Sequence, residues 1–181
     1  SIDDLTLTEV EARRLGEIAF LAGDRDWANA CYLMASEIAP GQSATLRSLC
    51  RLSRESGDDE KLRTHLEGLL NITPDEPELL REHARLLTKM GDAAAEVDLR
   101  RLEAMGVETA EDKSMMASLA ARAGNTDVAL QSIEVALASN PNADDWLRKA
   151  ELHLDRNERG LGISAVDEAI NINRQSGPAW S

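Results

Sequence analysis

Glycine and proline recur along this chain of 181 residues at an interval close to 34 residues. The glycines that set the interval are separated by 34, 34 and 33 residues: Gly23, Gly57, Gly91 and Gly124. Pro40 and Pro74 are also 34 residues apart, and Pro141 follows 67 residues later, with Val107 where the intervening proline would stand. Glycine ends one helix because it accepts a left-handed backbone, and proline ends the next because it has no amide hydrogen to donate. Each interval therefore predicts a helix, a tight turn, a second helix and a stop.

The segments between these marks have helical periodicity. In the first interval Ala28, Tyr32, Ala35 and Ile38 follow the spacing i, i+4, i+7 and i+10, which places them on one helix face. The same apolar face recurs in the later intervals: Leu62, Leu66 and Leu69; Ala95, Leu99 and Leu102; Ala129, Ile133 and Ala136; Gly162, Val166 and Ala169. Three pairs have the spacing of side-chain caps at a helix start: Thr8 with Glu11, Thr109 with Asp112, and Asn142 with Asp145.

These residues carry a resemblance to a known repeat. The runs that resemble the tetratricopeptide (TPR) repeat are Leu15, Gly16, Ala19, Gly23, Asp24, Ala28, Tyr32, Ala35 and Pro40, and then Ala117, Gly124, Ala129, Ile133, Ala136 and Pro141. Five units follow one another at about 9–42, 43–76, 77–109, 110–142 and 143–175, with the start of a further helix at 176–181. The resemblance implies an all-α fold, a right-handed superhelical solenoid of antiparallel helix pairs, which we expect to form a single domain over 1–181.

Some units depart from the repeat pattern. Cys50 stands where a small glycine or alanine is usual, and Leu62 stands where alanine is usual. The third unit is one residue short in its turn, and the fifth has Asn157 in the place of the turn glycine. Trp180 lies 34 residues after Trp146, which suggests that a sixth unit begins there. A chain that stops at this point would leave an adhesive end, so self-association through the C-terminal end is one expectation.

The resemblance also implies which residues face a concave groove, namely the fifth, ninth and twelfth of each unit. Seven of the chain's twenty basic residues lie at or beside these positions: Arg13, Arg47, Arg51, Arg54, Arg81, Arg85 and Lys89. Arginine binds carboxylates in bidentate fashion, so this basic stripe predicts a site for an acidic protein segment. The alternative is a face neutralised by the chain's own carboxylates, and four of these lie nearby: Glu17, Glu55, Glu78 and Glu82.

The basic stripe fades in the last two units. The matching residues there are neutral, apolar or acidic: Ser114, Ser118, Leu147, Glu151 and Leu154. A ligand along the groove would then place its acidic part on the first three units and apolar residues near Leu147 and Leu154. This arrangement predicts a protein-interaction scaffold. The rival interpretation is an accessory region of a larger bacterial enzyme or of an envelope or polysaccharide assembly protein.

Composition excludes several other classes. The net charge of −13 and an aromatic content of 3% disfavour nucleic-acid binding, which needs positive charge and stacking surfaces. No apolar run approaches the roughly 20 residues of a membrane helix, so we expect no membrane insertion. Sixteen arginines against four lysines suggest a GC-rich bacterial genome. Two cysteines make no disulfide framework, which favours the cytoplasm and leaves the periplasm open.

No residue pattern points to catalysis or to a cofactor. Cys31, Cys50, His65 and His83 are ligand-type residues in the first three units, but no two of them have the spacing of a metal site. A cysteine nucleophile would also need an oxyanion hole, for which the sequence offers no candidate. His153 is interpreted as a packed residue rather than an acid or base. We therefore expect a protein that is not an enzyme and holds neither metal nor cofactor.

Overall fold

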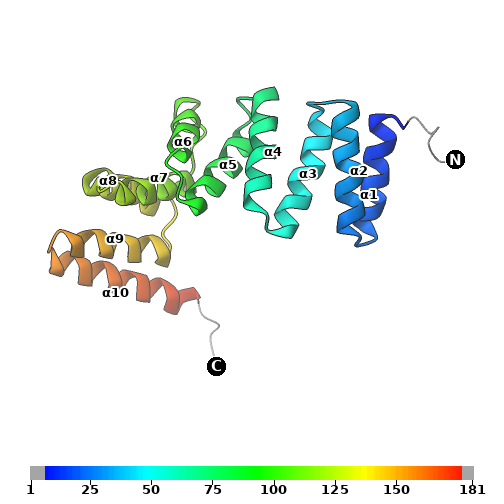
Figure 1. Ribbon diagram of the computed structural model, residues 1–181. Helices are drawn as coiled ribbons and strands as arrows, with labels where there is room; N and C mark the ends of the chain where they lie inside the picture. Colours follow the sequence, from blue (N-terminus) through cyan, green and yellow to red (C-terminus); the bar gives the residue numbers. More distant parts are fainter. Residues whose placement is uncertain (1–6, 177–181) are drawn as a thin grey trace. The chain divides into compact units, whose positions relative to one another are not determined.

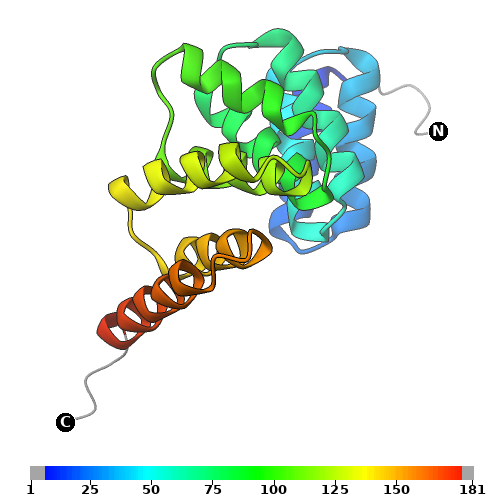
Figure 2. The same ribbon diagram turned by 90° about the vertical axis from the view of Figure 1, so that its left-hand side faces the viewer.

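The computed structural model describes residues 7–176, and these contain ten α-helices and no strand (Figure 1). The helices are α1 (Glu9–Leu21), α2 (Arg25–Ile38), α3 (Ser43–Ser56), α4 (Asp59–Ile72), α5 (Pro77–Met90), α6 (Ala95–Ala104), α7 (Ala110–Arg122), α8 (Thr126–Ser139), α9 (Ala143–Asp155) and α10 (Arg159–Ser176). They form antiparallel pairs, so the predicted all-α, TPR-like fold of paired helices is confirmed. Figures 1 and 2 both show α9 and α10 side by side, and α1 and α2 pack in the same way.

The chain divides into two compact units, one over 1–86 and one over 87–181. A single domain over 1–181 stays a prediction. The helix pairs α1–α2, α3–α4, α5–α6 and α7–α8 fall inside the expected repeats, and α10 continues one residue past the expected end of the fifth. The further helix expected at 176–181, with Trp180, lies outside the described residues beyond Ser176. Self-association through that end therefore also stays a prediction.

Every helix pair turns at one residue with a left-handed backbone. The residues are Gly23, Gly57, Gly91, Gly124 and Asn157, with φ of 84°, 69°, 78°, 76° and 61°. In the fifth pair the amide of Glu158 donates to the carbonyl of His153 at 2.9 Å, as the amide of Asn125 does to that of Ala120 at 2.8 Å in the fourth. Asparagine is among the few L-residues that tolerate this conformation, so Asn157 replaces the turn glycine without changing the turn.

The predicted caps form. Thr8 and Glu11 make a reciprocal capping box at the start of α1, and Thr109 and Asp112 make another at α7. At α9 the Asn142 side chain accepts a hydrogen bond from the amide of Asp145. These bonds satisfy amides that have no partner inside a helix, which is why the helices begin where they do.

The third repeat is one residue short, and a tight turn at the start of α6 accommodates the difference. The amides of Ala95, Glu96 and Val97 donate three residues back, to Asp92, Ala93 and Ala94, in a tight turn ahead of a helix of only ten residues. At the other end Gly106, with φ 69°, ends the segment, and the amide of Val107 donates to the carbonyl of Leu102 at 3.2 Å. A turn at Gly106 thus ends this repeat, where Val107 stands in place of the proline.

In the first unit the core lies between helices whose facing residues are matched in size. A Cβ added to Gly16 would lie 2.5 Å from the Cε1 of Tyr32, which is fully buried. Only glycine therefore fits beside this ring. At the equivalent positions of the next repeat the larger Cys50 stands with the smaller Leu66, and both are buried. A conserved total volume is what a close-packed core requires.

The second unit has its own core. A cluster of buried residues joins α7, α8 and α9, and Trp146 is partly buried against it. The cluster consists of Ala117, Ala120, Ala129, Leu130, Ile133, Leu137 and Leu152. Among the described residues no helix is both long enough and apolar enough to cross a membrane.

Candidate functional site

Three arginines of α3 surround one hollow in the first unit. Arg47, Arg51 and Arg54 follow the spacing i, i+4, i+7 on one face of this helix, and all three line a cavity of about 410 Å³. Their side chains are 50%, 39% and 52% exposed. The cavity is also lined by Cys50 of α3 and by apolar residues of the neighbouring helices: Leu66, Leu69 and Leu79. The hollow thus combines exposed arginines and the carboxylates Glu17 and Glu82 with leucines that are almost fully buried.

Arg51 is the most firmly held of the three. Its Nη2 donates to Glu17 of α1 at 2.5 Å and to the hydroxyl of Tyr32 at 3.2 Å, and its guanidinium stacks on Phe20 at 4.0 Å from the ring centroid. Ser48 donates to the other oxygen of Glu17 at 3.1 Å. Burial raises the pKa of the Glu17 carboxyl, but the hydrogen bonds from Arg51 and Ser48 and the charge of Arg51 outweigh it and leave that pKa below its ordinary value. Glu17 is therefore a fixed anion.

Arg47 and Arg54 have simpler partners on the other side of α3. Arg47 Nη2 donates to both oxygens of Glu76, at 3.0 and 2.8 Å, and Glu76 belongs to the turn before α5. Arg54 donates from Nε at 3.0 Å and also from Nη2 to one oxygen of Glu82 on α5. The arginines of α3 thus cross-link α1, α3 and the start of α5, the neighbouring first helices of three successive repeats.

The other residues of the predicted basic stripe lie apart from this hollow. Arg13 pairs with Glu9 at 3.2 Å on its own helix, and Arg81, largely buried, pairs with Glu78 at 2.8 Å. Arg85 also takes part in a polar or ring interaction, as does Lys89, which falls in the second unit. The structure therefore brings together Arg47, Arg51 and Arg54. Whether the remaining four contact a ligand stays a prediction.

Sequence reasoning found some of the partners and missed others. Glu17, Glu78 and Glu82 pair with stripe arginines, whereas Glu55 pairs with Arg25 at 2.5 Å. Glu76, Phe20 and Tyr32 went unnoticed as partners. The 34-residue offset of Glu17 from Arg51, the repeat length itself, was the signal that could have found cross-repeat pairs of this kind.

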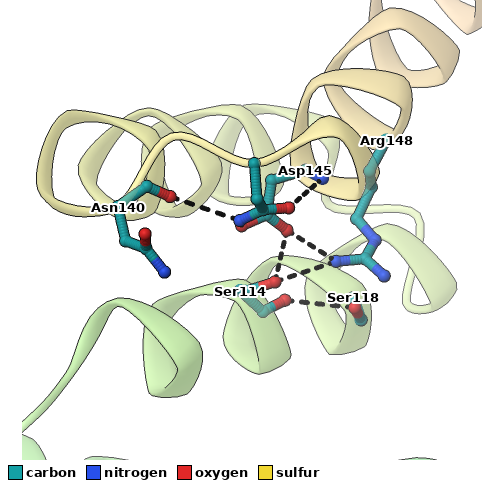
Figure 3. Close-up of polar contacts among 6 residues, drawn as sticks. Ser114, Ser118, Asn140, Asp145 and Arg148 are labelled. Atoms are coloured by element: carbon teal, nitrogen blue, oxygen red, sulfur yellow. Dashed lines mark hydrogen bonds and ion pairs between the residues drawn. The ribbon is translucent and has the colours of Figure 1, made fainter. Parts of the chain in front are cut away.

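In the second unit a polar cluster forms around a buried carboxylate, that of Asp145 (Figure 3). The Asp145 carboxylate accepts hydrogen bonds from Ser114 at 2.5 Å, from Arg148 at 3.1 Å and from the Asn142 amide at 2.8 Å. Asp145 is only 3% exposed. Arg148 also donates to Ser114 at 3.0 Å, so the cluster joins α7 to α9. A hollow of about 350 Å³ beside it is lined by two further acids, Glu111 and Asp144.

No arrangement for covalent chemistry is found among the described residues. Both cysteines are buried, and burial raises the pKa of the Cys50 thiol to about 12, so this thiol is protonated at neutral pH. Within residues 7–176 no group of three or more histidine, cysteine or acidic side chains is placed to hold a metal ion. His153 is buried, with its Nδ1 2.7 Å from Glu158. The polar contacts of both sites are ion pairs and hydrogen bonds.

Solved structures with the same fold are numerous, although the sequence matches no known family profile and no curated protein sequence. A crystal structure of MamA superposes with a TM-score of 0.79 at 14% identity, covering 96% of each chain. MamA from Desulfovibrio magneticus RS-1, from residue 41 to its end, gives 0.77 at 11% identity over 92% of this chain and 96% of that one. YrrB, described as a TPR protein with an unusual peptide-binding site, gives 0.75 at 17% identity over 94% and 89%.

Proposed function

Because the chain has the fold of tetratricopeptide-repeat proteins, we propose that it is a non-catalytic interaction module that binds an acidic segment of another protein on the α3 face of the first unit. One observation carries the proposal: Arg47, Arg51 and Arg54 lie on one helix face around one hollow. The structural neighbour YrrB, described by its peptide-binding site, supports the same kind of function.

Charge supports the acidic character of the partner. The whole chain carries −13, and its hollow in the first unit is lined by three arginines against Glu17 and Glu82. Each arginine is paired with one carboxylate of the chain, so the site is close to neutral on a strongly negative protein. A short acidic segment therefore meets less repulsion there than over the acidic remainder of the surface. Guanidinium groups bind carboxylates with charge-assisted, often bidentate hydrogen bonds. The partner is thus expected to bring one or more exposed carboxylates.

The test compares charge reversal on α3 with charge reversal elsewhere on the first unit. Arg47→Glu/Arg54→Glu should abolish capture of the partner by the immobilised chain. Arg14→Glu/Arg63→Glu carries the same change in net charge and alters α1 and α4 away from the hollow, so it should bind as the unchanged chain does. Capture should also weaken as salt rises, because exposed charges are screened over about 8 Å at physiological ionic strength. Equal capture by both double variants would exclude the α3 face as the site.

A further inference from the structure

The groove arginines that an acidic partner would use are already bound by the chain's own carboxylates. We propose that the partner binds by carboxylate exchange: two of its carboxylates replace Glu76 on Arg47 and Glu82 on Arg54, while Glu17 remains on Arg51. This inference rests on the proposed function and specifies its ligand. The division into two exchangeable pairs and one fixed pair follows from how each glutamate is held.

Glu17 is held by several contacts at once. One carboxylate oxygen accepts from Arg51 at 2.5 Å and the other from Ser48 at 3.1 Å. Arg51 is fixed in turn by Tyr32 and by the ring of Phe20, so neither partner of this pair can leave without breaking other interactions. Arg51 is therefore a positioning residue, which sets the place of α3 against α1.

Glu76 and Glu82 are bound more loosely. The glutamates themselves are about as exposed as Glu17, but their arginines are 50% and 52% exposed against 39% for Arg51. Apart from Arg47, Glu76 accepts only a long hydrogen bond, 3.3 Å, from the Thr73 hydroxyl next to it in the same turn. Exposed ion pairs of this kind contribute little to stability, so an incoming carboxylate displaces them at small cost. The released glutamates remain at the protein surface.

The spacing of the exchangeable arginines selects the ligand. Arg47 and Arg54 are seven residues apart on one helix face, which corresponds to about 10 Å along the axis. In a polyproline II segment, acidic residues three apart lie on the same face and about 9 Å from each other. The leucines that line the hollow, Leu66, Leu69 and Leu79, are almost fully buried, so the exposed arginines are what a ligand meets. The ligand class is therefore an extended segment with acids at i and i+3.

The exchange is tested with a fluorescein-labelled peptide, Pro-Pro-Glu-Leu-Pro-Glu-Pro-Pro, titrated with the full chain. Removing the competing carboxylates in Glu76→Gln/Glu82→Gln should tighten binding about fivefold, as expected if displacement of two surface pairs is no longer required. The control Glu60→Gln/Glu67→Gln removes the same charge from α4 and should change affinity less than about twofold, by long-range charge alone. Glu17→Gln should weaken binding, because Arg51 loses its anchor. Circular dichroism of each variant confirms that it is folded.

The outcomes separate the two proposals. If the unchanged chain and Glu76→Gln/Glu82→Gln bind the peptide equally, while Arg47→Glu/Arg54→Glu does not bind it, the exchange is wrong and the α3 site stands. Tightening by the α4 control to the same extent, or by Glu17→Gln, would also overturn the exchange. If no form of the chain binds the peptide, both the exchange and the acidic ligand are wrong. A peptide with its two glutamates adjacent should bind more weakly than the spaced one, and equal binding would overturn the spacing argument.

Discussion

The two units each place an acid, a serine and an arginine across neighbouring first helices, in reversed order. In the first unit Glu17 of α1 accepts from Ser48 and Arg51 of α3, 31 and 34 residues later. In the second, Ser114 of α7 bonds with Asp145 and Arg148 of α9 at the same two offsets. The acid stands on the earlier helix in one unit and on the later helix in the other.

Burial decides what each arrangement can do. Asp145 is enclosed and its two oxygens accept three hydrogen bonds, so the cluster in the second unit is a closed structural joint. Around α3, by contrast, Arg47 and Arg54 are about half exposed, and each pairs with a carboxylate that water can also reach. Similar side chains thus form either a buried structural contact or a solvent-exposed ion pair, and under the function proposed above only the exposed pairs are available to a partner.

The largest loss of stability is expected at the buried cluster around Asp145. Asp145→Ala leaves the donors of Ser114, Arg148 and Asn142 without their common acceptor, and breaking such a buried pair costs about 3 kcal/mol. Urea unfolding measures the loss, with Glu82→Ala as the open-pair control at less than about 1 kcal/mol. Similar losses of stability in the two variants would show that burial does not distinguish the Asp145 cluster from the exposed ion pairs of α3.

A second difference is expected within α3 itself. Arg51→Met should cost about 1–2 kcal/mol, since it removes two hydrogen bonds and the stacking on Phe20. Arg47→Met and Arg54→Met should each cost less than about 1 kcal/mol in the same urea experiment. If all three substitutions are equivalent, Arg51 is not a fixed residue and the first unit contains three exchangeable pairs.

The turns and caps of the helices were predicted from the sequence better than the contacts between successive repeats. Turn residues such as Gly57 and Asn157 and caps such as Thr8 are local, so spacing alone identifies them. Glu17 and Glu82 were also recognised as neighbours of the stripe. Glu76 and Asp145 were not recognised as partners across repeats, because their roles depend on the angle between helices from successive repeats. Periodicity says which face a residue lies on and leaves that angle open.

A smaller effect is expected in the pH dependence of stability that Glu17 contributes to the first unit. Because the pKa of Glu17 is lower in the folded protein than its ordinary value of 4.5, its contribution is present above that value and is lost as pH falls through the folded pKa. Glu17→Gln should therefore lose less stability than the unchanged chain between pH 5 and pH 3, by less than about 1 kcal/mol. Burial lowers the pKa of His65, so its effect begins as pH falls below 6.5, and it is common to both chains. Identical pH profiles below pH 5 would show that Glu17 is not a fixed anion.

The smallest effect concerns the turns. In the first unit the turns inside the helix pairs use glycine, whereas the last turn of the second unit uses Asn157 at φ 61°. Asn157→Gly should stabilise the chain by about 0.5 kcal/mol, because glycine has no steric cost in this conformation. Gly57→Asn provides the matched reverse change in the first unit and should destabilise it by a similar amount. Thermal unfolding followed by circular dichroism resolves both changes, and shifts of the same sign in the two variants would contradict the argument.

The buried Tyr32 beside Gly16, together with Phe20, also determines how this protein can be observed. These are the chain's only tyrosine and phenylalanine, and Trp27 lies between them in the sequence, whereas no aromatic residue occurs from Ser43 to Ser139. The near-ultraviolet signal of the first unit therefore reports on α1 and α2, and that of the described second unit on Trp146. The hollow beside α3 is lined by no aromatic side chain. Because the chain's own tryptophans would emit together with a tryptophan in a ligand, binding there is followed with a label such as fluorescein, which absorbs outside the range of the aromatic side chains.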